Sequence, residues 1–259
     1  MLVTRIGGPS LLVELDGWRI LVDPTFDAPG RRYKFGYGTS STKTTAPAIP
    51  LAEIGPVDLV LLSHDQHPDN LDDAGRAMLP VATHVLTTRQ GARRLKLPNT
   101  RGLAPGEAVR LKGAGGSELE VTATPCQHGP RFARPIVGDA VGFAVRRPQA
   151  QRHDLWVTGD TVLYPGLLKA ARELAVDVAI VNGGGVRFGI TGPIHYTMTG
   201  AEVVRLVAQL DARVIIPAHF DGWSHFVDGE SGIRTALDAA PAALRAKFHW
   251  LADGVPTEP

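Results

Sequence analysis

Histidine and aspartate side chains gather just after the apolar runs of this 259-residue chain. The set consists of His64, His67, His128, Asp160 and His219. Each follows a short run that is typical of a β-strand, and the ends of strands at one edge of a sheet bring distant positions together. We therefore expect these five side chains to converge on one site.

Imidazole and carboxylate groups together suit a borderline-soft divalent cation, most often Zn²⁺. Carboxylates alone would have favoured Mg²⁺ or Ca²⁺. A catalytic ion with an open coordination position lowers the pKa of its bound water toward about 7, which makes hydroxide available at neutral pH. The sequence therefore predicts a hydrolytic metal site for Zn²⁺, with Mn²⁺ or iron as alternatives.

Short strands must position these groups. Residues 58–62 form a continuous apolar run that ends at Ser63-His64, which is typical of a strand covered on both faces. Asp16-Gly17 separates two apolar runs and predicts a hairpin. Further strands are predicted at 82–87, 107–111, 118–125, 141–147, 154–158, 177–181 and 212–217. Helices are predicted at 70–78, 88–95, 164–174, 199–209 and 230–239.

The N-terminal half is thus mostly β, and the C-terminal half alternates strand and helix. Sheets packed on each other with helices outside fit this order of elements, and we expect one domain over residues 1–259. Residues 24–50 are rich in Pro, Gly, Ser and Thr and show no periodicity. They predict either a functional loop or a mobile surface excursion.

The segment Leu-Leu-Ser-His-Asp-Gln-His-Pro-Asp-Asn-Leu-Asp at 61–72 resembles the first metal motif of the metallo-β-lactamase superfamily, His-x-His-x-Asp-His. It is similar to the branch containing the L-ascorbate-6-phosphate lactonases and the N-acylphosphatidylethanolamine phospholipases D. Members of that branch often read Ser-His-x-His-x-Asp-His-Leu-Asp. Four shorter motifs match in the expected order, at 23–24, 124–129, 158–161 and 217–220.

The match has two departures. One extra residue makes the spacing His64-x-x-His67, and Asn70 stands where the family usually has histidine. The resemblance implies His64, His67 and His128 for a first metal position, and Asp69 and His219 for a second, with Asp160 bridging. The neutral amide oxygen of Asn70 is a weaker ligand, which predicts a weakened or empty second position. Asp65 is an additional candidate ligand in the same segment.

The resemblance implies an α+β fold, the four-layer αββα sandwich of the metallo-β-lactamases. It implies hydrolysis of an ester-type bond by a water that one or two metal ions activate, with a phosphodiester or lactone ahead of a β-lactam. Asp69 would orient this water and assist proton transfer. The alternative is a catalytically impaired binding or sensing domain on the same fold, because the first metal motif is altered.

Other residues are candidates for supporting a ligand or contacting substrate. Asp23 would hydrogen-bond a ligand histidine or serve the turn before Pro24. His195, Trp223 and His225 would line the pocket or contact substrate, or lie on the surface. Four cations would recognise an anionic substrate group or be plain surface residues: Arg31, Arg32, Lys34 and Arg187.

Composition narrows the class of partner. Lys plus Arg number 27 and Asp plus Glu 26, a formal charge of +1, which gives no argument for nucleic acid or a membrane surface. The single cysteine, Cys126, excludes an intrachain disulfide. The first residues do not resemble a secretion signal, and no apolar run approaches the roughly 20 residues of a membrane helix. We expect a cytoplasmic protein with a small-molecule substrate, and a homo-oligomer remains open.

Overall fold

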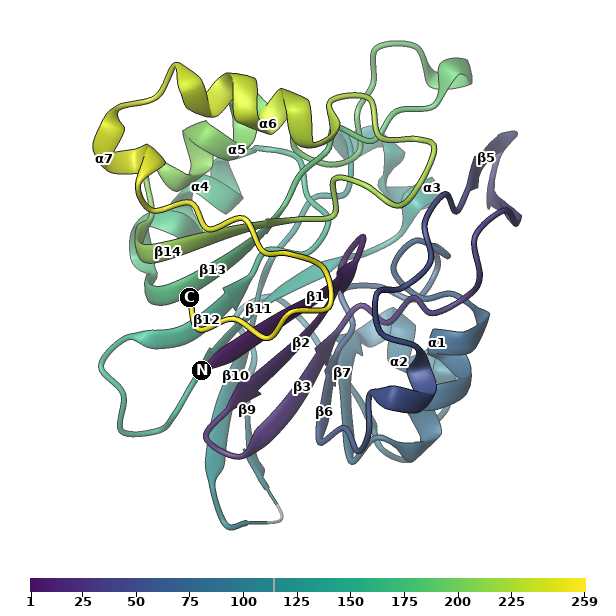
Figure 1. The fold of residues 1–259 in the computed structure, drawn as a ribbon. Helices are drawn as coiled ribbons and strands as arrows, with labels where there is room; N and C mark the ends of the chain where they lie inside the picture. Colours follow the sequence, from purple (N-terminus) through teal and green to yellow (C-terminus); the bar gives the residue numbers. More distant parts are fainter. Residues whose placement is uncertain (114) are drawn as a thin grey trace.

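Two stacked six-stranded β-sheets form the centre of the computed structural model, which describes residues 1–113 and 115–259 (Figure 1). The first sheet comprises, in spatial order, β1 (Leu2–Gly7), β2 (Ser10–Leu15), β3 (Trp18–Val22), β6 (Leu59–Leu61), β7 (His84–Thr88) and β8 (Thr100–Leu103). The second comprises β14 (Asp211–Ala218), β13 (Ala175–Asn182), β12 (His153–Val157), β11 (Val141–Arg146), β10 (Glu118–Pro125) and β9 (Ala108–Lys112).

Alternation along the strands sends side chains to two different apolar layers. In β12, Leu155 and Val157 enter the core between the sheets, whereas Trp156 faces the helices on the outside. In β3, Ile20 enters the same central core and Leu21 packs on the opposite outer face. The central core therefore joins side chains from both halves of the chain.

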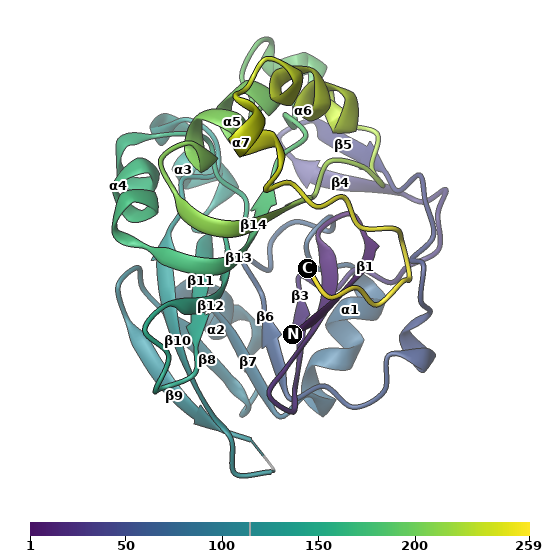
Figure 2. The same cartoon turned by 60° about the vertical axis from the view of Figure 1, so that its left-hand side comes forward.

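Helices cover the two outer faces (Figure 1, Figure 2). The α-helices are α1 (Asp73–Met78), α2 (Arg89–Leu95), α3 (Arg134–Val137), α4 (Pro165–Glu173), α5 (Gly200–Val207), α6 (Gly229–Asp238) and α7 (Ala242–Arg245). Short 3₁₀ helices occupy Leu51–Glu53, Leu79–Val81, Arg131–Ala133 and Gly189–Thr191. The first pair, α1 and α2, lies on the first sheet, and α4, α5 and α6 lie on the second. The order of layers is αββα, as the sequence predicted.

Local signals explain several of these boundaries. Asp16 and Gly17 both adopt positive φ, 51° and 82°, in the turn that joins β2 to β3, so the predicted hairpin is confirmed. Thr199 caps α5, and Glu202 completes a capping box at its first turn. The helices predicted at 88–95, 164–174, 199–209 and 230–239 all form within two residues of their expected ends. The helix predicted from 70 begins only at Asp73, because Asp72 is its cap.

Residues 24–50 are more ordered than the sequence indicated. β4 (Arg32–Gly36) and β5 (Thr39–Thr42) pair in a two-stranded sheet of their own. Sequence reasoning also missed β1 and the short, partly polar β8, which lie at the two edges of the first sheet. In β1 the buried positions include Thr4 and Arg5, and β8 is short with one buried residue, so neither strand forms a continuous apolar run.

The strands that end near one another set the position of the site. β6 runs parallel to β3 and β7, and β12, β13 and β14 are parallel to one another. β10 is antiparallel to β11, which is antiparallel to β12, so β10 and β12 end on the same side. Among the described residues, no helix has both the length and the apolar character needed to span a bilayer.

Candidate metal centre

The carboxyl ends of β6, β10, β12 and β14 deliver the histidines and aspartates of the sequence motif to one place. His64 and His67 follow β6, His128 follows β10, and Asp160 and His219 follow β12 and β14. All five side chains are buried. His219 adopts a positive φ of 52°, an uncommon conformation for a residue with a side chain. The backbone therefore turns sharply where this strand meets the site.

Three of these histidines form a first donor group. The Nε2 atom of His64 lies 2.9 Å from Nδ1 of His67, and Nε2 of His128 lies 3.0 Å from the same Nδ1. Ligand nitrogens around a tetrahedral zinc ion lie about 3.4 Å apart, given zinc–nitrogen bonds of about 2.0–2.1 Å. The three rings thus already have nearly the spacing that such an ion requires, despite the extra residue between His64 and His67.

Hydrogen bonds behind the rings fix which nitrogen faces the centre. Nδ1 of His128 lies 2.9 Å from the backbone carbonyl of Tyr196, which can only accept, so this nitrogen carries the proton. Its Nε2 therefore presents a lone pair to the other two rings. Nδ1 of His64 lies 2.9 Å from Oγ of Ser63, and this contact holds the ring with its Nε2 toward His67. A carbonyl or hydroxyl behind the ring is the usual support for a ligand histidine.

The first donor group is uncharged at neutral pH. Burial lowers the pKa of His64 well below its usual value and lowers that of His67 to about 4, and the neighbouring imidazoles add to both effects. Burial also lowers the pKa of His128. Two nitrogens face the single Nδ1 of His67, and one proton there could serve only one of them. Converging neutral nitrogens of this kind fit a bound cation.

Asp69, His219 and His225 form a second donor group, whose ligand atoms all lie within 4.8 Å of one another. Nε2 of His225 lies 3.2 Å from Oδ2 of Asp69, and Nε2 of His219 lies 3.5 Å from the same oxygen. Oδ1 of Asp69 and both ring nitrogens of His225 have no hydrogen-bond partner among the described residues. Unpartnered buried donors and acceptors are costly unless an ion or water meets them, so this group also fits a cation.

Asp160 holds His219 from behind. Its Oδ1 lies 2.7 Å from Nδ1 of His219 and accepts a hydrogen bond of 2.9 Å from the amide of Asn182. Its Oδ2 is buried and unpartnered in the described structure, which leaves one oxygen for a cation. Burial alone would lower the pKa of His219, but Asp160 and Asp69 outweigh it and raise this pKa to about 10. The same contacts hold the pKa of Asp160 and of Asp69 below the usual range, against the opposing effect of burial.

His225 is the member of this centre whose position sequence reasoning did not identify. It was expected only to line the pocket, whereas its ring completes the second donor group. The ring stacks on Trp223, with centroids 6.1 Å apart and planes 7° apart, so Trp223 supports His225 from behind. Its place in an irregular loop beyond β14 gave no periodic signal. The one available signal was its position six residues after His219.

Asn70 is held through its amide nitrogen, which donates hydrogen bonds of 3.3 Å to Asp23 and to Oγ of Ser63. Its amide oxygen is buried and has no hydrogen-bond partner among the described residues. Asp23 accepts a 2.6 Å bond from the backbone of Ser63 rather than bonding a ligand histidine as expected. Burial raises the pKa of Asp23 to about 7. Asn70 and Asp23 therefore fix the loop that carries His64.

Two further candidates are engaged by other residues. The carboxylate of Asp65 is turned toward Arg94, whose Nε lies 2.9 Å from Oδ2, so Asp65 joins neither donor group. His195 lies 3.0 Å from Glu202, the residue of the α5 capping box, and is engaged there. Each side chain is held by a partner that is distant in sequence or lies on a following helix, which the motif spacing could not reveal.

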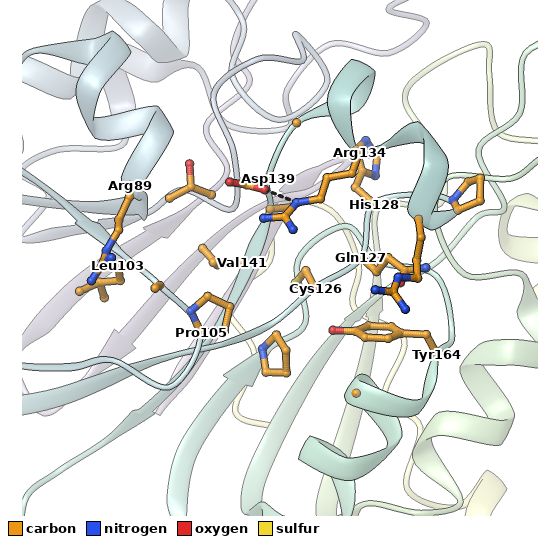
Figure 3. A pocket seen from close by; sticks show the side chains of 18 of the residues that line it. Arg89, Leu103, Pro105, Cys126, Gln127, His128, Arg134, Asp139, Val141 and Tyr164 are labelled. Carbon is orange, nitrogen blue, oxygen red and sulfur yellow. Dashed lines mark hydrogen bonds and ion pairs between the residues drawn. The ribbon is translucent and has the colours of Figure 1, made fainter.

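Two hollows meet at His128. A cavity of about 680 Å³ reaches it from one side, beside Cys126, Gln127, Tyr164 and the Arg134–Asp139 ion pair (Figure 3). A smaller cavity of about 100 Å³ lies directly in front of His67, Asp69 and His128, and is lined mainly by apolar and aromatic side chains. The smaller cavity touches both donor groups, so it is the place where a substrate would meet bound ions.

Comparison with known proteins identifies relatives over most of the chain. The model of the Beta-lactamase superfamily domain matches residues 18–220. A UPF0173 metal-dependent hydrolase of Caldivirga maquilingensis is 27% identical over 220 residues, 83% of this chain and 80% of that protein. A Salmonella heidelberg protein named "Probable L-ascorbate-6-phosphate lactonase UlaG" is 27% identical over 228 residues, 80% of this chain and 61% of that protein. The crystal structure of the isothiocyanate hydrolase from Delia radicum gut bacteria superposes with a TM-score of 0.77 at 21% identity, over 100% of this chain and 99% of that one.

Proposed function

The chain belongs to the beta-lactamase superfamily, and we propose that it is a metal-dependent hydrolase of a lactone or another carboxylic ester. The predicted αββα metallo-β-lactamase fold is confirmed by the two helix-covered sheets and by the structural match over the whole chain. We also propose that residues 1–259 act as one domain, because the core between the sheets takes Val3 and Val22 from the first sheet and Val121 and Ile216 from the second.

The observation that carries this proposal is the pair of donor groups beside one cavity. His64, His67 and His128 would hold one ion, and Asp69, His219 and His225 a second. The free oxygen of Asp160 would be a further ligand for a bound ion. Mixed nitrogen and carboxylate donors favour Zn²⁺, with Mn²⁺ and iron as the alternatives.

Bound ions would supply a water of lowered pKa and a Lewis acid for the acyl oxygen. Oδ1 of Asp69, buried and without a partner among the described residues, would orient that water and take up its proton. The water oxygen bonds to the acyl carbon, the acyl carbon–oxygen bond breaks, and the proton passes to the leaving alkoxide. Tyr196 would keep His128 in the ligand tautomer through its carbonyl.

The cavity and the relatives both favour a carboxylic ester or lactone as the bond that is cleaved. Within the described part of the chain, no lysine or arginine lines the cavity in front of the donor groups, which disfavours a phosphodiester. Relatives named as metal-dependent hydrolases and one named as a lactonase favour an ester or lactone. A β-lactam is a less favoured substrate than a phosphodiester or a lactone, as the branch resemblance implied.

The competing function is a binding or sensing domain that has lost its catalytic metal. It was motivated by Asn70 and by the extra residue in the first motif. His225 offsets the first departure, and the close approach of the three histidine nitrogens offsets the second. The complete donor groups therefore favour the enzyme.

Metal analysis with a substrate panel tests the proposal. The protein is purified, dialysed against Zn²⁺, Mn²⁺ or Fe²⁺, and analysed for bound metal by mass spectrometry. Hydrolysis of γ-lactones, phenyl acetate and bis(p-nitrophenyl) phosphate is then measured. One to two ions per chain with turnover of a lactone or ester supports the enzyme. Protein that stays metal-free and inert after dialysis supports the binding domain.

A further inference from the structure

The cavity in front of the donor groups has an apolar lining. Its walls include Phe35 and Tyr37 from the β4–β5 hairpin, Ile136 and Val137 from α3, and Phe188 and Tyr196 from the segment after β13. The ring of Phe35 lies 5.6 Å from that of His67 and 5.6 Å from that of Phe188. Aromatic side chains thus stand directly against the candidate metal ligands.

The cations expected to recognise an anionic group are elsewhere. Arg31 pairs with Asp73, and Arg32 donates to the hydroxyl of Ser40 within its own hairpin. Lys34 is exposed and Arg187 is partly exposed, and neither lines the cavity. An anionic substrate group against these walls would therefore meet mainly apolar side chains and, among the described residues, no lysine or arginine, so it would lose hydration without an ion pair to a side chain.

Apolar side chains also remain exposed at the mouth of this cavity. Tyr37 is 73% exposed, Ile190 is 71% exposed, and Ile136 is more than half exposed. They belong to three different segments, and a Cβ on Gly38 would lie 3.3 Å from Ile190, so the hairpin tip and the 189–191 turn meet. Contiguous exposed apolar side chains are uncommon unless they bind something.

The floor of the cavity identifies the occupant as a small molecule. His67, Asp69 and His128 form that floor, and a partner chain seated on the mouth would close off the donor groups. The space of about 100 Å³ is of the order of an apolar cavity of about 150 Å³ that takes up benzene. A ring or a short chain fits inside, with any longer part against the exposed rim.

We propose that this cavity binds an uncharged apolar group of the substrate, an aryl ring or a short alkyl chain, and so places the bond to be cleaved over His67, Asp69 and His128. This inference rests on the proposed hydrolase function and names its substrate class. It replaces the expectation of an anionic substrate group. The β4–β5 hairpin, α3 and the 186–196 segment are the parts of the chain that select the substrate.

The experiment compares three lactones on the metal-loaded protein: γ-valerolactone, γ-nonalactone, and a γ-lactone of the same length as the second that ends in a carboxylate. We expect kcat/KM for γ-nonalactone to exceed that for γ-valerolactone by about tenfold or more. Burying one methylene is worth about fourfold, so tenfold requires less than half of the four added methylenes to be buried. The carboxylate-ended lactone should be no better than γ-valerolactone.

Two variants and a control assign the effect to the cavity. Phe188→Ala and Tyr37→Ser should each lower the preference for γ-nonalactone severalfold. Tyr37 is 73% exposed and lies outside the core, so its replacement leaves the fold in place. Val81→Ser changes a side chain that is 81% exposed but lies outside the cavity, and it should leave the preference unchanged. Circular dichroism verifies that each variant is folded.

A binding readout separates this inference from the proposed function. The neutral fluorescent probe N-phenyl-1-naphthylamine is bound to the protein after EDTA treatment and displaced with each lactone. We expect γ-nonalactone to displace the probe at about tenfold lower concentration than γ-valerolactone, and Phe188→Ala to reduce this difference. That result supports the apolar site even if no lactone is hydrolysed. That result without turnover would defeat only the proposed function.

Three results overturn the inference. One is a kcat/KM for the carboxylate-ended lactone that equals or exceeds that for γ-nonalactone. Another is a chain-length preference or probe affinity that neither variant changes. The third is a dimer in size-exclusion chromatography that Tyr37→Ser converts to monomer with the lactone preference intact, because the rim would then be an interface between copies of the chain.

Discussion

The two donor groups lie side by side but differ in how they balance charge. The first, His64, His67 and His128, consists of neutral imidazoles whose pKa values burial has lowered. In the second, Asp69 is ionised and His219 holds its proton, because nearby carboxylates raise its pKa to about 10. The first group therefore has no internal countercharge, whereas the second carries an ion pair of its own.

This difference shows what each group requires from a cation. The first group has converging lone pairs that a cation would satisfy, and the low pKa values oppose their protonation. The second group can rest with His219 protonated against Asp160 and Asp69, so an ion that binds there must displace that proton. We therefore expect the first position to bind metal more tightly at neutral pH than the second.

The largest loss of bound metal and of hydrolysis should come from removing His67, which contacts both other histidines of the first group. His67→Ala takes away the nitrogen that His64 and His128 both face. We expect bound metal to fall by about one ion per chain and hydrolysis to fall more than about a hundredfold, beyond the loss typical of a residue that only supports a ligand. Mass spectrometry and kcat/KM measure both. Retention of full metal content would mean that the first position is not where the ion binds.

His225→Ala breaks the second group and leaves the first intact. The expected loss is the more weakly held ion, with a decrease of roughly 10–100-fold in hydrolysis. Titration of the metal-free variant with Zn²⁺ should then show one binding step where the unaltered protein shows two. His195→Ala is the matched control, because that imidazole is engaged by Glu202 outside both groups. If two steps remain in His225→Ala, the second group as defined here is wrong.

The pH dependence of unfolding of the metal-free protein separates the two groups. The folded pKa of His67, about 4, lies below its unfolded value of about 6.5, so the unfolded chain takes up the proton first on acidification. Stability should fall by about 2 kcal/mol from pH 7 to pH 5 through His67. The raised pKa of His219 acts on the other side: its contribution is fully present below about pH 6.5 and is lost as the pH rises toward 10.

Urea unfolding after EDTA treatment measures this profile, which should have its maximum near neutral pH. His67→Gln removes one of the three titrating rings, so it should make the acid side shallower without abolishing it, because His64 and His128 remain, and it should leave the alkaline side in place. A free energy of unfolding that is the same at pH 5 and pH 7 would show that the first group is not held neutral by burial.

The smallest effect is expected at Asn70, whose amide nitrogen supports the loop that carries His64. Asn70→Ala removes two hydrogen bonds of 3.3 Å, to Asp23 and Ser63, and should cost about 1 kcal/mol of stability. Metal content should stay unchanged. Thermal unfolding and metal analysis check the two statements separately, and a loss of bound metal would restore Asn70 as a ligand.

Sequence reasoning reached the parts of the centre that follow strand ends. His64, His128 and His219 come after apolar runs whose order fixes the edge of the sheet where they meet, so their convergence was predictable. His225 follows no strand, and the buried carboxylate of Asp65 pairs with Arg94 on α2, a contact across 29 positions. The β4–β5 hairpin was not predicted because its strands are short, contain mostly polar residues and bury few of their side chains. What the sequence pattern missed is set by tertiary contacts rather than by local periodicity.

The β4–β5 hairpin forms its own two-stranded sheet, separate from the two sheets that carry the donor groups. Its exposed tip, which includes Tyr37, can therefore be altered or lengthened while the central sandwich and the ion-binding atoms stay as they are. Evolution or engineering could broaden the range of accepted molecules by altering this insert, and the hydrolytic chemistry would be inherited unchanged.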